Sequence, residues 1–132
     1  MDFKIGFTFE KQDTGGRFVR GWASVASVDG RPVEDFQGDV IAMDDLRKAA
    51  HRFVSDARVA KAMHKGEAVG QVVESVLVDD EFARALGVSD PRRGWWIGME
   101  ILDPAVRKRV RTGELKAFSI GGKGRRQPME NT

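Results

Sequence analysis

The first quarter of the chain alternates apolar and polar residues, a pattern that predicts half-buried β-strands. Across residues 4–11, phenylalanine and isoleucine alternate with polar residues and glycine, so one face of this segment is apolar. A turn-rich run follows at 13–16, and residues 18–26 again have strand composition. The two segments are therefore expected to form a hairpin. Residues 27–38 have little apolar content and are expected to form a loop.

A helical period replaces this alternation further along the chain. From Asp44 onward, apolar residues recur at i, i+3, i+4, i+7 and i+8, and Asp44 or Asp45 is well placed to cap the helix. These apolar positions are Leu46, Ala49, Ala50, Phe53 and Val54. A shorter helix is predicted at 80–86, where a glycine follows it. An aspartate-proline pair opens a third helix at 104–112, because proline is favoured in a first helical turn.

The remaining apolar runs predict further strands. They lie at residues 59–64, 68–78, 94–102 and 115–122. The run at 94–102 carries bulky residues on both faces, which favours a central strand. About six strands with two or three helices between them indicate a mainly β fold with helices (α+β), arranged as a small antiparallel β-barrel with packed helices. Residues 1–124 are expected to form one domain, and residues 125–132 a frayed basic and polar tail or a truncated end.

The amino-acid composition excludes several kinds of catalytic and binding site. The chain has no cysteine, so thiol catalysis and thiolate metal sites are excluded. Its two histidines, His51 and His64, form no close ligand pair, so neither a metal nor a cofactor is expected. No apolar run approaches the length of a membrane span, and membrane partners are not expected. Residues 103–126 hold eight basic residues and two acids; nucleic acid could bind there, but an ordinary solvated face is favoured.

Ser119 is the best candidate nucleophile in the chain. It lies between Phe118 and Ile120 in a short apolar strand, so its hydroxyl points away from the face that they bury. The next residues, Gly121 and Gly122, would let backbone N–H groups approach a ligand closely, which makes them oxyanion-hole candidates. The alternative is a strand-end serine bonded to the backbone, with the glycines marking a bulge or turn.

The two histidines differ in their expected settings. His64 ends a predicted strand beside a turn, where a side chain can be held firmly and still reach solvent, although a structural role is also open. His51 falls on the polar face of the helix predicted from Asp44, and is expected to be a solvated surface residue.

Several motifs together carry a resemblance to a known family. They are Gly21-Trp22-Ala23-Ser24-Val25, Gln37-Gly38-Asp39-Val40-Ile41, a strand ending in His64, Val69-Gly70, Gly94-Trp95-Trp96-Ile97-Gly98-Met99 and Gly113-Glu114-Leu115-Lys116-Ala117-Phe118-Ser119-Ile120-Gly121-Gly122. Over roughly residues 21–124 the chain resembles the phage prohead proteases, capsid-maturation serine proteases with a fold similar to that of herpesvirus assemblins. The segment around Ser119 does not fit a G-x-S-x-G elbow, because Ala117 takes the first glycine position, so an α/β-hydrolase is disfavoured.

The resemblance implies an assemblin-like fold and a serine endopeptidase with Ser119 as nucleophile and His64 as general base. It also implies major capsid and scaffold proteins as substrates, self-cleavage, a homo-oligomer, and a location in the host cytoplasm inside an assembling phage procapsid. The chemistry agrees, since a hydroxyl needs a base within hydrogen-bond reach at neutral pH. The alternative is a catalytically silent barrel module of the procapsid that binds scaffold protein or nucleic acid.

The third catalytic residue is unassigned. The resemblance implies a residue that orients the histidine on a strand beyond the serine, but only thirteen residues follow Ser119, and Glu130 is the one acid among them. Ser119 and His64 could act as a dyad, or an upstream carboxylate such as Glu74 or Glu100 could substitute. We favour a fragment that lacks its last strand, because a barrel ending at its nucleophile strand would leave an open edge.

Overall fold

The computed structural model describes residues 2–34, 40–57, 61–64 and 67–123. In chain order its elements are β1 (Asp2–Gln12), β2 (Phe18–Val28), β3 (Arg31–Pro32), α1 (Met43–Ala57), β4 (Lys61–His64), β5 (Glu67–Val78), α2 (Asp80–Leu86), β6 (Arg92–Ile101), α3 (Pro104–Arg111) and β7 (Ala117–Lys123). All strands but the two-residue β3 match segments predicted from the sequence. The expected tail at 125–132 lies outside the described residues.

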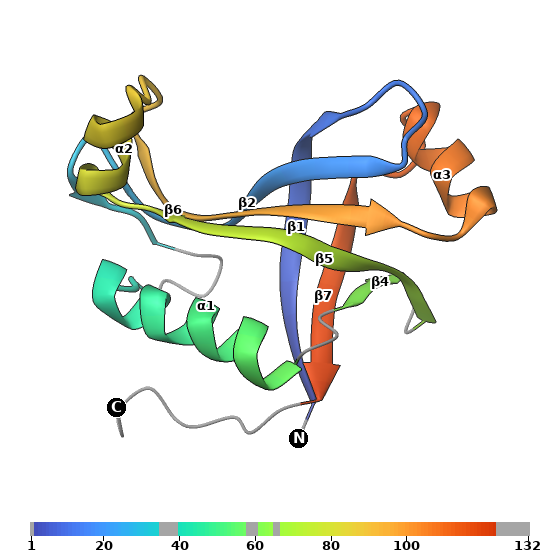
Figure 1. Cartoon of the computed structure of the whole chain (residues 1–132), viewed down its shortest axis with the longest axis horizontal. Helices are drawn as coiled ribbons and strands as arrows, with labels where there is room; N and C mark the ends of the chain where they lie inside the picture. The colour runs from blue at the N-terminus through green and yellow to red at the C-terminus, as the bar shows by residue number, and fades with distance from the viewer. Residues whose placement is uncertain (1, 35–39, 58–60, 65–66, 124–132) are drawn as a thin grey trace.

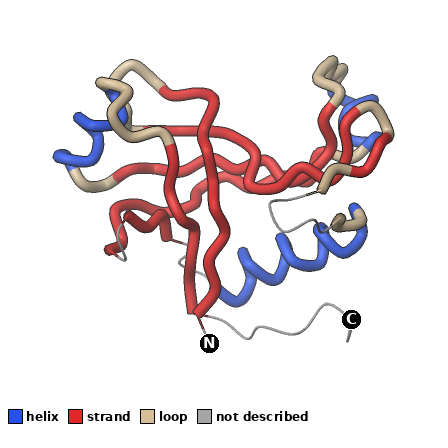
Figure 2. Tube along the Cα trace, turned by 180° about the vertical axis from the view of Figure 1, so that it is seen from behind, coloured by secondary structure: helices blue, strands red, loops and turns tan. Residues whose placement is uncertain are grey.

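The strands form one curled antiparallel sheet. Its order is β1-β7-β4-β5-β6-β2-β3, and β1 also pairs with β2, so the pairings run in a ring through six strands. Figure 1 shows how the curl makes β1 and β7 cross the direction of β2, β5 and β6, and Figure 2 shows the same crossing from behind. The predicted mainly β fold with packed helices is confirmed in this coarse form.

The core lies inside this curl. Trp95, Ile97 and Met99 of β6 are almost completely buried, and β2 and β5 pair with the two edges of that strand. The prediction of a central strand is therefore confirmed. Apolar side chains of one face of α1 and two valines of α3 complete the core. These helical residues are Leu46, Ala50, Phe53, Val106 and Val110.

The helix α1 packs through only part of its predicted apolar stripe. Phe53 meets Trp95 in an edge-to-face contact with ring centroids 5.3 Å apart, a geometry that aromatic pairs favour. Val54 was expected to share this buried face, but 48% of it is exposed. The helix lies against β5, β6 and β7 along one side, and Val54 is outside the buried part of its apolar stripe. Figure 1 shows α1 alongside the sheet.

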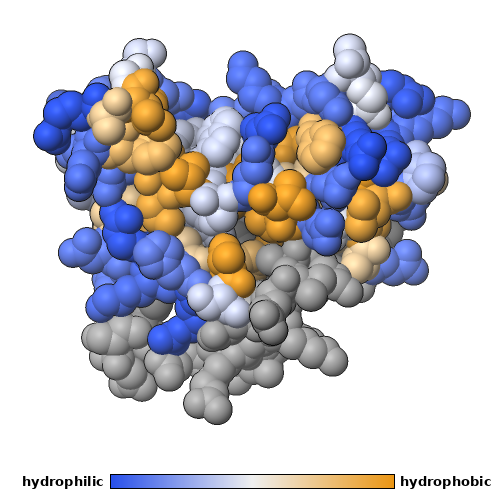
Figure 3. All heavy atoms as spheres, in the orientation of Figure 1, coloured by the Kyte–Doolittle hydropathy of each residue, from blue (hydrophilic) through white to orange (hydrophobic). Residues whose placement is uncertain are grey.

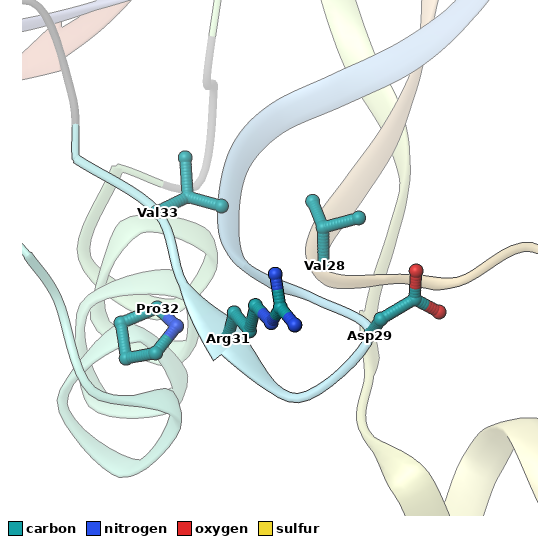
Figure 4. Close-up of a pocket in the computed structure, with 5 residues that line it drawn as sticks. All are labelled: Val28, Asp29, Arg31, Pro32 and Val33. Atoms are coloured by element: carbon teal, nitrogen blue, oxygen red, sulfur yellow. The ribbon is translucent and has the colours of Figure 1, made fainter.

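The expected loop at 27–38 begins as a tight hairpin. Val28 of β2 pairs with Arg31 of β3, and both turn residues between them, Asp29 and Gly30, have positive φ angles of 51° and 77°. An Asp-Gly pair in this conformation is the favoured two-residue hairpin turn, a signal in the sequence that the loop prediction missed. A shallow pocket of about 410 Å³ lies at this hairpin, and Figure 4 shows the side chains that line it.

None of the helices in the described ranges combines the length and the apolar content that crossing a membrane requires.

Candidate active site

Ser119 lies in the middle of β7, on the face of the sheet that points away from the core. Its neighbours Phe118 and Ile120 are 4% and 0% exposed, and side chains alternate between the two faces of a strand. Ser119 is half-buried and pairs with Gly6 of β1 and Met63 of β4. No hydrogen bond to its hydroxyl is found among the described residues, so the oxygen is not committed to a structural partner there.

His64 is the last residue of β4, next along the chain from the residue that pairs with Ser119. Cα atoms of directly opposed residues in antiparallel strands lie about 4.5–5.5 Å apart, so the backbones at His64 and Ser119 are close neighbours. Sheet formation thus brings together the two residues that the sequence analysis singled out for catalysis.

The observed register does not aim these two side chains at each other. Ser119 pairs with residue 63 of β4, so alternation along β4 places the side chain of His64, the next residue, on the opposite face of the sheet from Ser119. In keeping with this, His64 contacts α3, where its Nε2 lies 3.2 Å from Nη1 of Arg109. A guanidinium can only donate, so Nε2 accepts and the ring proton lies on Nδ1.

Arg109 links His64 to a carboxylate. Its Nε donates to Oε2 of Glu114 at 3.2 Å, and its backbone carbonyl accepts from the N–H of Leu115 at 3.0 Å. The sequence analysis assigned this basic helix to solvent and missed the contact. No spacing in the sequence connects residue 109 with residue 64, because α3 and β4 meet only through the folded sheet.

The two upstream carboxylates considered as orienting groups lie in ion pairs with arginines near or on β2. Glu100 accepts from Arg17 at 2.7 Å and Glu74 from Arg20 at 2.7 Å. The hydrogen bond from Arg17 lowers the pKa of Glu100. In the described residues neither carboxylate is joined to His64, and their role as a third catalytic member stays a prediction.

The two candidate oxyanion glycines differ in their pairing. Gly121 lies between Lys4 of β1 and Lys61 of β4. Gly122 pairs with Phe3 of β1, and the position opposite it on the β4 side, residue 60, lies outside the described residues.

His51, expected to be a solvated surface residue, is exposed but also lines a groove. The groove has a volume of about 540 Å³ and lies between α1 and β5. Its lining residues are Arg47, His51, Val54, Ser55, Ser75, Val76 and Leu77. Ser75 is already engaged there, since its Oγ accepts from Nε1 of Trp95 at 2.8 Å.

Among the described residues, no group of three or more acidic or histidine side chains is arranged to hold a metal ion. The candidate site consists of the Ser119 hydroxyl, the His64 imidazole with Arg109, and the backbone at Gly121 and Gly122.

Comparison with known proteins points to one family. The family model described as "Putative phage serine protease XkdF" matches residues 8–127. Two proteins of Bacillus subtilis (strain 168) are similar to the chain. The phage-like element PBSX protein XkdF is 30% identical over 91 residues, which cover 68% of this chain and 32% of that protein. A protein named uncharacterized protein YqbD is 29% identical over 89 residues, covering 67% of this chain and 27% of that protein.

The chain thus spans about a third or less of the length of these curated relatives. No solved structure matches the chain.

Proposed function

We propose a function from the premise that this chain belongs to the phage serine protease XkdF family, whose model covers nearly all of it: it is a serine endopeptidase with Ser119 as nucleophile and His64 as general base. The observation that carries the proposal is the β4–β7 register, in which Met63 pairs with Ser119 and His64 follows. The two residue types needed for acyl transfer thus lie on neighbouring strands of one sheet.

The proposed chemistry is that of acyl transfer. His64 takes the proton of the Ser119 hydroxyl as the oxygen attacks the substrate carbonyl, and it later returns a proton to the leaving amine. Backbone N–H groups at Gly121 and Gly122 are the proposed donors to the oxyanion. No metal or cofactor takes part in this scheme.

In this register His64 must move before it can activate Ser119. His64 faces Arg109 rather than Ser119, so the imidazole has to release the guanidinium and reach the other face of the sheet. A shift of β4 by one residue against β7 would place His64 directly opposite Ser119, because one step along a strand exchanges its two faces. Catalytic hydrogen bonds are often made only when substrate is bound.

Phage structural proteins are the substrates that fit this family. We propose that the enzyme cleaves scaffold and capsid-protein segments, and itself, within an assembling procapsid, and that its sheet has the assemblin topology. The arginine contact at His64 favours one alternative, a catalytically silent module of the same fold, since it occupies the nitrogen that a general base would use.

A fluorophosphonate probe separates these two functions. The reagent forms a covalent bond with an activated serine oxygen, and peptide mass spectrometry then identifies the modified residue. The proposal expects one adduct, on Ser119, that disappears after heat denaturation. An unmodified protein at long incubation, or equal labelling of several serines, would favour the silent module.

A further inference from the structure

The contact between Arg109 and His64 occupies the atom that the proposed general base would use. Nη1 of Arg109 lies 3.2 Å from Nε2 of His64, and both residues are half-buried. Because a guanidinium can only donate, this hydrogen bond takes up the lone pair of Nε2. The imidazole cannot accept a proton from Ser119 while the bond lasts, so the contact between β4 and α3 is inhibitory.

Few other groups hold Arg109 in place. Its Nε donates to Oε2 of Glu114 at 3.2 Å, and these two side chains are 36% and 62% exposed. An ion pair so open to water contributes little. Among the described residues Nη2 has no hydrogen-bond partner, so the guanidinium keeps donors free for a ligand. A carboxylate can bind a guanidinium through two parallel hydrogen bonds, which neither His64 nor Glu114 makes here.

The surface next to Arg109 is basic. Lys108 and Arg111 are exposed, and neither forms an ion pair within the described part of the chain. With about 3.6 residues per turn, Lys108 lies on the outer side of α3, opposite Val106 and Val110, which are buried. Arg109 and Arg111 lie on the two flanks of the helix. In Figure 3 the region of α3, at the upper right, is mostly hydrophilic. An anionic ligand that reaches Arg109 from solvent therefore also meets Lys108.

We propose that Arg109 holds His64 in an inactive position, and that an acidic peptide segment of a partner protein activates the enzyme by pairing with Arg109 and Lys108. A carboxylate of the segment takes the guanidinium, and Nε2 of His64 loses its donor. The imidazole is then free to turn toward Ser119. Arg109 is thus a positioning residue that acts through His64, and this role rests on the proposed function of Ser119 and His64.

A short acidic peptide fits this surface better than nucleic acid does. A carboxylate, that of Glu114, already binds the guanidinium of Arg109. Affinity for a phosphate backbone comes instead from many basic contacts made along it. The cations of α3 are divided, because Arg111 lies on the far flank and Arg107 donates to a backbone carbonyl at the end of β6 at 2.6 Å. On α3 two cations, Lys108 and Arg109, remain for one ligand.

The first experiment examines the contact itself and needs no catalysis. In the Ser119→Ala variant at about pH 8, where an ordinary imidazole is neutral, nitrogen-15 NMR of the His64 ring reports which nitrogen carries the proton. We expect the Nδ1–H form in the free protein, because Nε2 accepts from Arg109 and the hydrogen bond of one ring nitrogen fixes the tautomer.

The probe ligand is a capped hexapeptide of glutamate, and capped hexalysine at equal ionic strength is its control. Saturating hexaglutamate should abolish the preference for the Nδ1–H form, and hexalysine should leave it unchanged. No binding of hexaglutamate, or binding that leaves the ring spectrum unchanged, would overturn the proposal. If an oligonucleotide of thymidine releases His64 and hexaglutamate does not, the partner is nucleic acid and the peptide proposal is wrong.

The second experiment measures the consequence for Ser119. Hexaglutamate should accelerate fluorophosphonate labelling of Ser119 by up to about tenfold, the value of one net hydrogen bond. In Arg109→Ala labelling should already be fast, and the peptide should add nothing because its target is absent. Arg111→Ala, on the opposite flank of α3, is the matched control and should respond to the peptide as the parent protein does. Equal responses in the two variants would contradict the role of Arg109.

A third variant tests the competition for the guanidinium. Glu114→Gln removes the internal carboxylate that binds Arg109, so hexaglutamate should bind up to about fivefold more tightly; weaker binding would count against the site. The two proposals fail in different ways. A change of tautomer with no labelling of Ser119 under any condition would refute the catalytic function and leave the inhibitory contact standing. Labelling that neither Arg109→Ala nor hexaglutamate alters would refute the inhibitory contact alone.

Discussion

The two histidines each have a serine nearby, but in different settings. His64 and Ser119 lie on neighbouring strands of the sheet, one position out of register. His51 and Ser75 line a groove between a helix and a strand. The hydroxyl of Ser75 already accepts a hydrogen bond from Trp95, while in the described residues that of Ser119 has no such partner.

This contrast separates a serine with a structural role from one whose hydroxyl has no structural partner among the described residues. A serine that supports a buried tryptophan contributes to the fold, because an unpaired indole N–H in the core is costly. Ser119 supports nothing of this kind, and its histidine is held on a strand rather than on an exposed helix face.

The largest expected effect is that of Ser119→Ala. Removing the nucleophile should lower the rate of peptide-bond cleavage by at least about a thousandfold and leave the folded state intact, because the hydroxyl points away from the core. The measurement is cleavage of candidate phage structural proteins followed by mass spectrometry, with circular dichroism as the control for folding. Ser75→Ala is the matched variant and should keep most of the activity. If Ser75→Ala is the more damaging change, the assignment of the two serines is reversed.

Replacing each histidine by alanine tests which of the two acts on Ser119. His64→Ala should reduce the rate of fluorophosphonate labelling by about 10²–10⁴, the usual contribution of a general base. His51→Ala should leave labelling within about twofold, because a small reagent does not need the groove. Similar losses in both variants would contradict the pairing of His64 with Ser119.

Arg109→Ala tests whether the arginine competes with Ser119 for the imidazole. Nε2 cannot accept from a guanidinium and take the serine proton at once, and a net hydrogen bond is worth about 0.5–1.5 kcal/mol. We therefore expect labelling of Ser119 to become faster by up to about tenfold. Arg111→Ala, in the same helix but without a recorded contact to His64, is the control. A slower reaction in Arg109→Ala would mean that the arginine holds the ring in a productive orientation.

The smallest effect concerns the rim of the groove. Asp79 caps α2 by accepting from the N–H of Phe82 at 2.7 Å and also pairs with Arg47 of α1. Asp79→Ala should cost about 1 kcal/mol of stability, the usual value for a lost helix cap. Asp79→Asn keeps a capping oxygen and should cost less. Both are measured by urea unfolding, with m-values compared to confirm that the transition is unchanged.

The same unfolding experiment, repeated at acidic pH, should show how Asp79 contributes to the free energy of unfolding. The hydrogen bond from Phe82 and the pairing with Arg47 lower the pKa of Asp79, so its folded-state pKa lies below its unfolded value. Its contribution is present above about pH 4 and is lost as the pH falls through the folded-state pKa. Asp90 behaves in the same way, with a pKa lowered to about 2 by Arg92. In Asp79→Ala the loss of stability below pH 4 should be smaller than in the parent protein.

The sequence by itself determined the local elements. Alternation predicted the β1–β2 hairpin, and Asp103 with Pro104 predicted the start of α3, where Asp103 indeed accepts from the N–H of Ala105 at 2.9 Å. Such features depend on residues within a few positions of one another, so short-range sterics and hydrogen bonding decide them. The sequence also made Ser119 a candidate nucleophile, and the family resemblance implied His64 as its general base.

Only the tertiary structure decided what these elements face. Burial of a common core sets which distant strands pair and in which register, and one step of register exchanges the two faces of a strand. That step separates His64 from Ser119 and turns it toward Arg109 of a helix far along the chain. This contact has no signature in the spacing of residues, because it arises where separate elements meet around the same core.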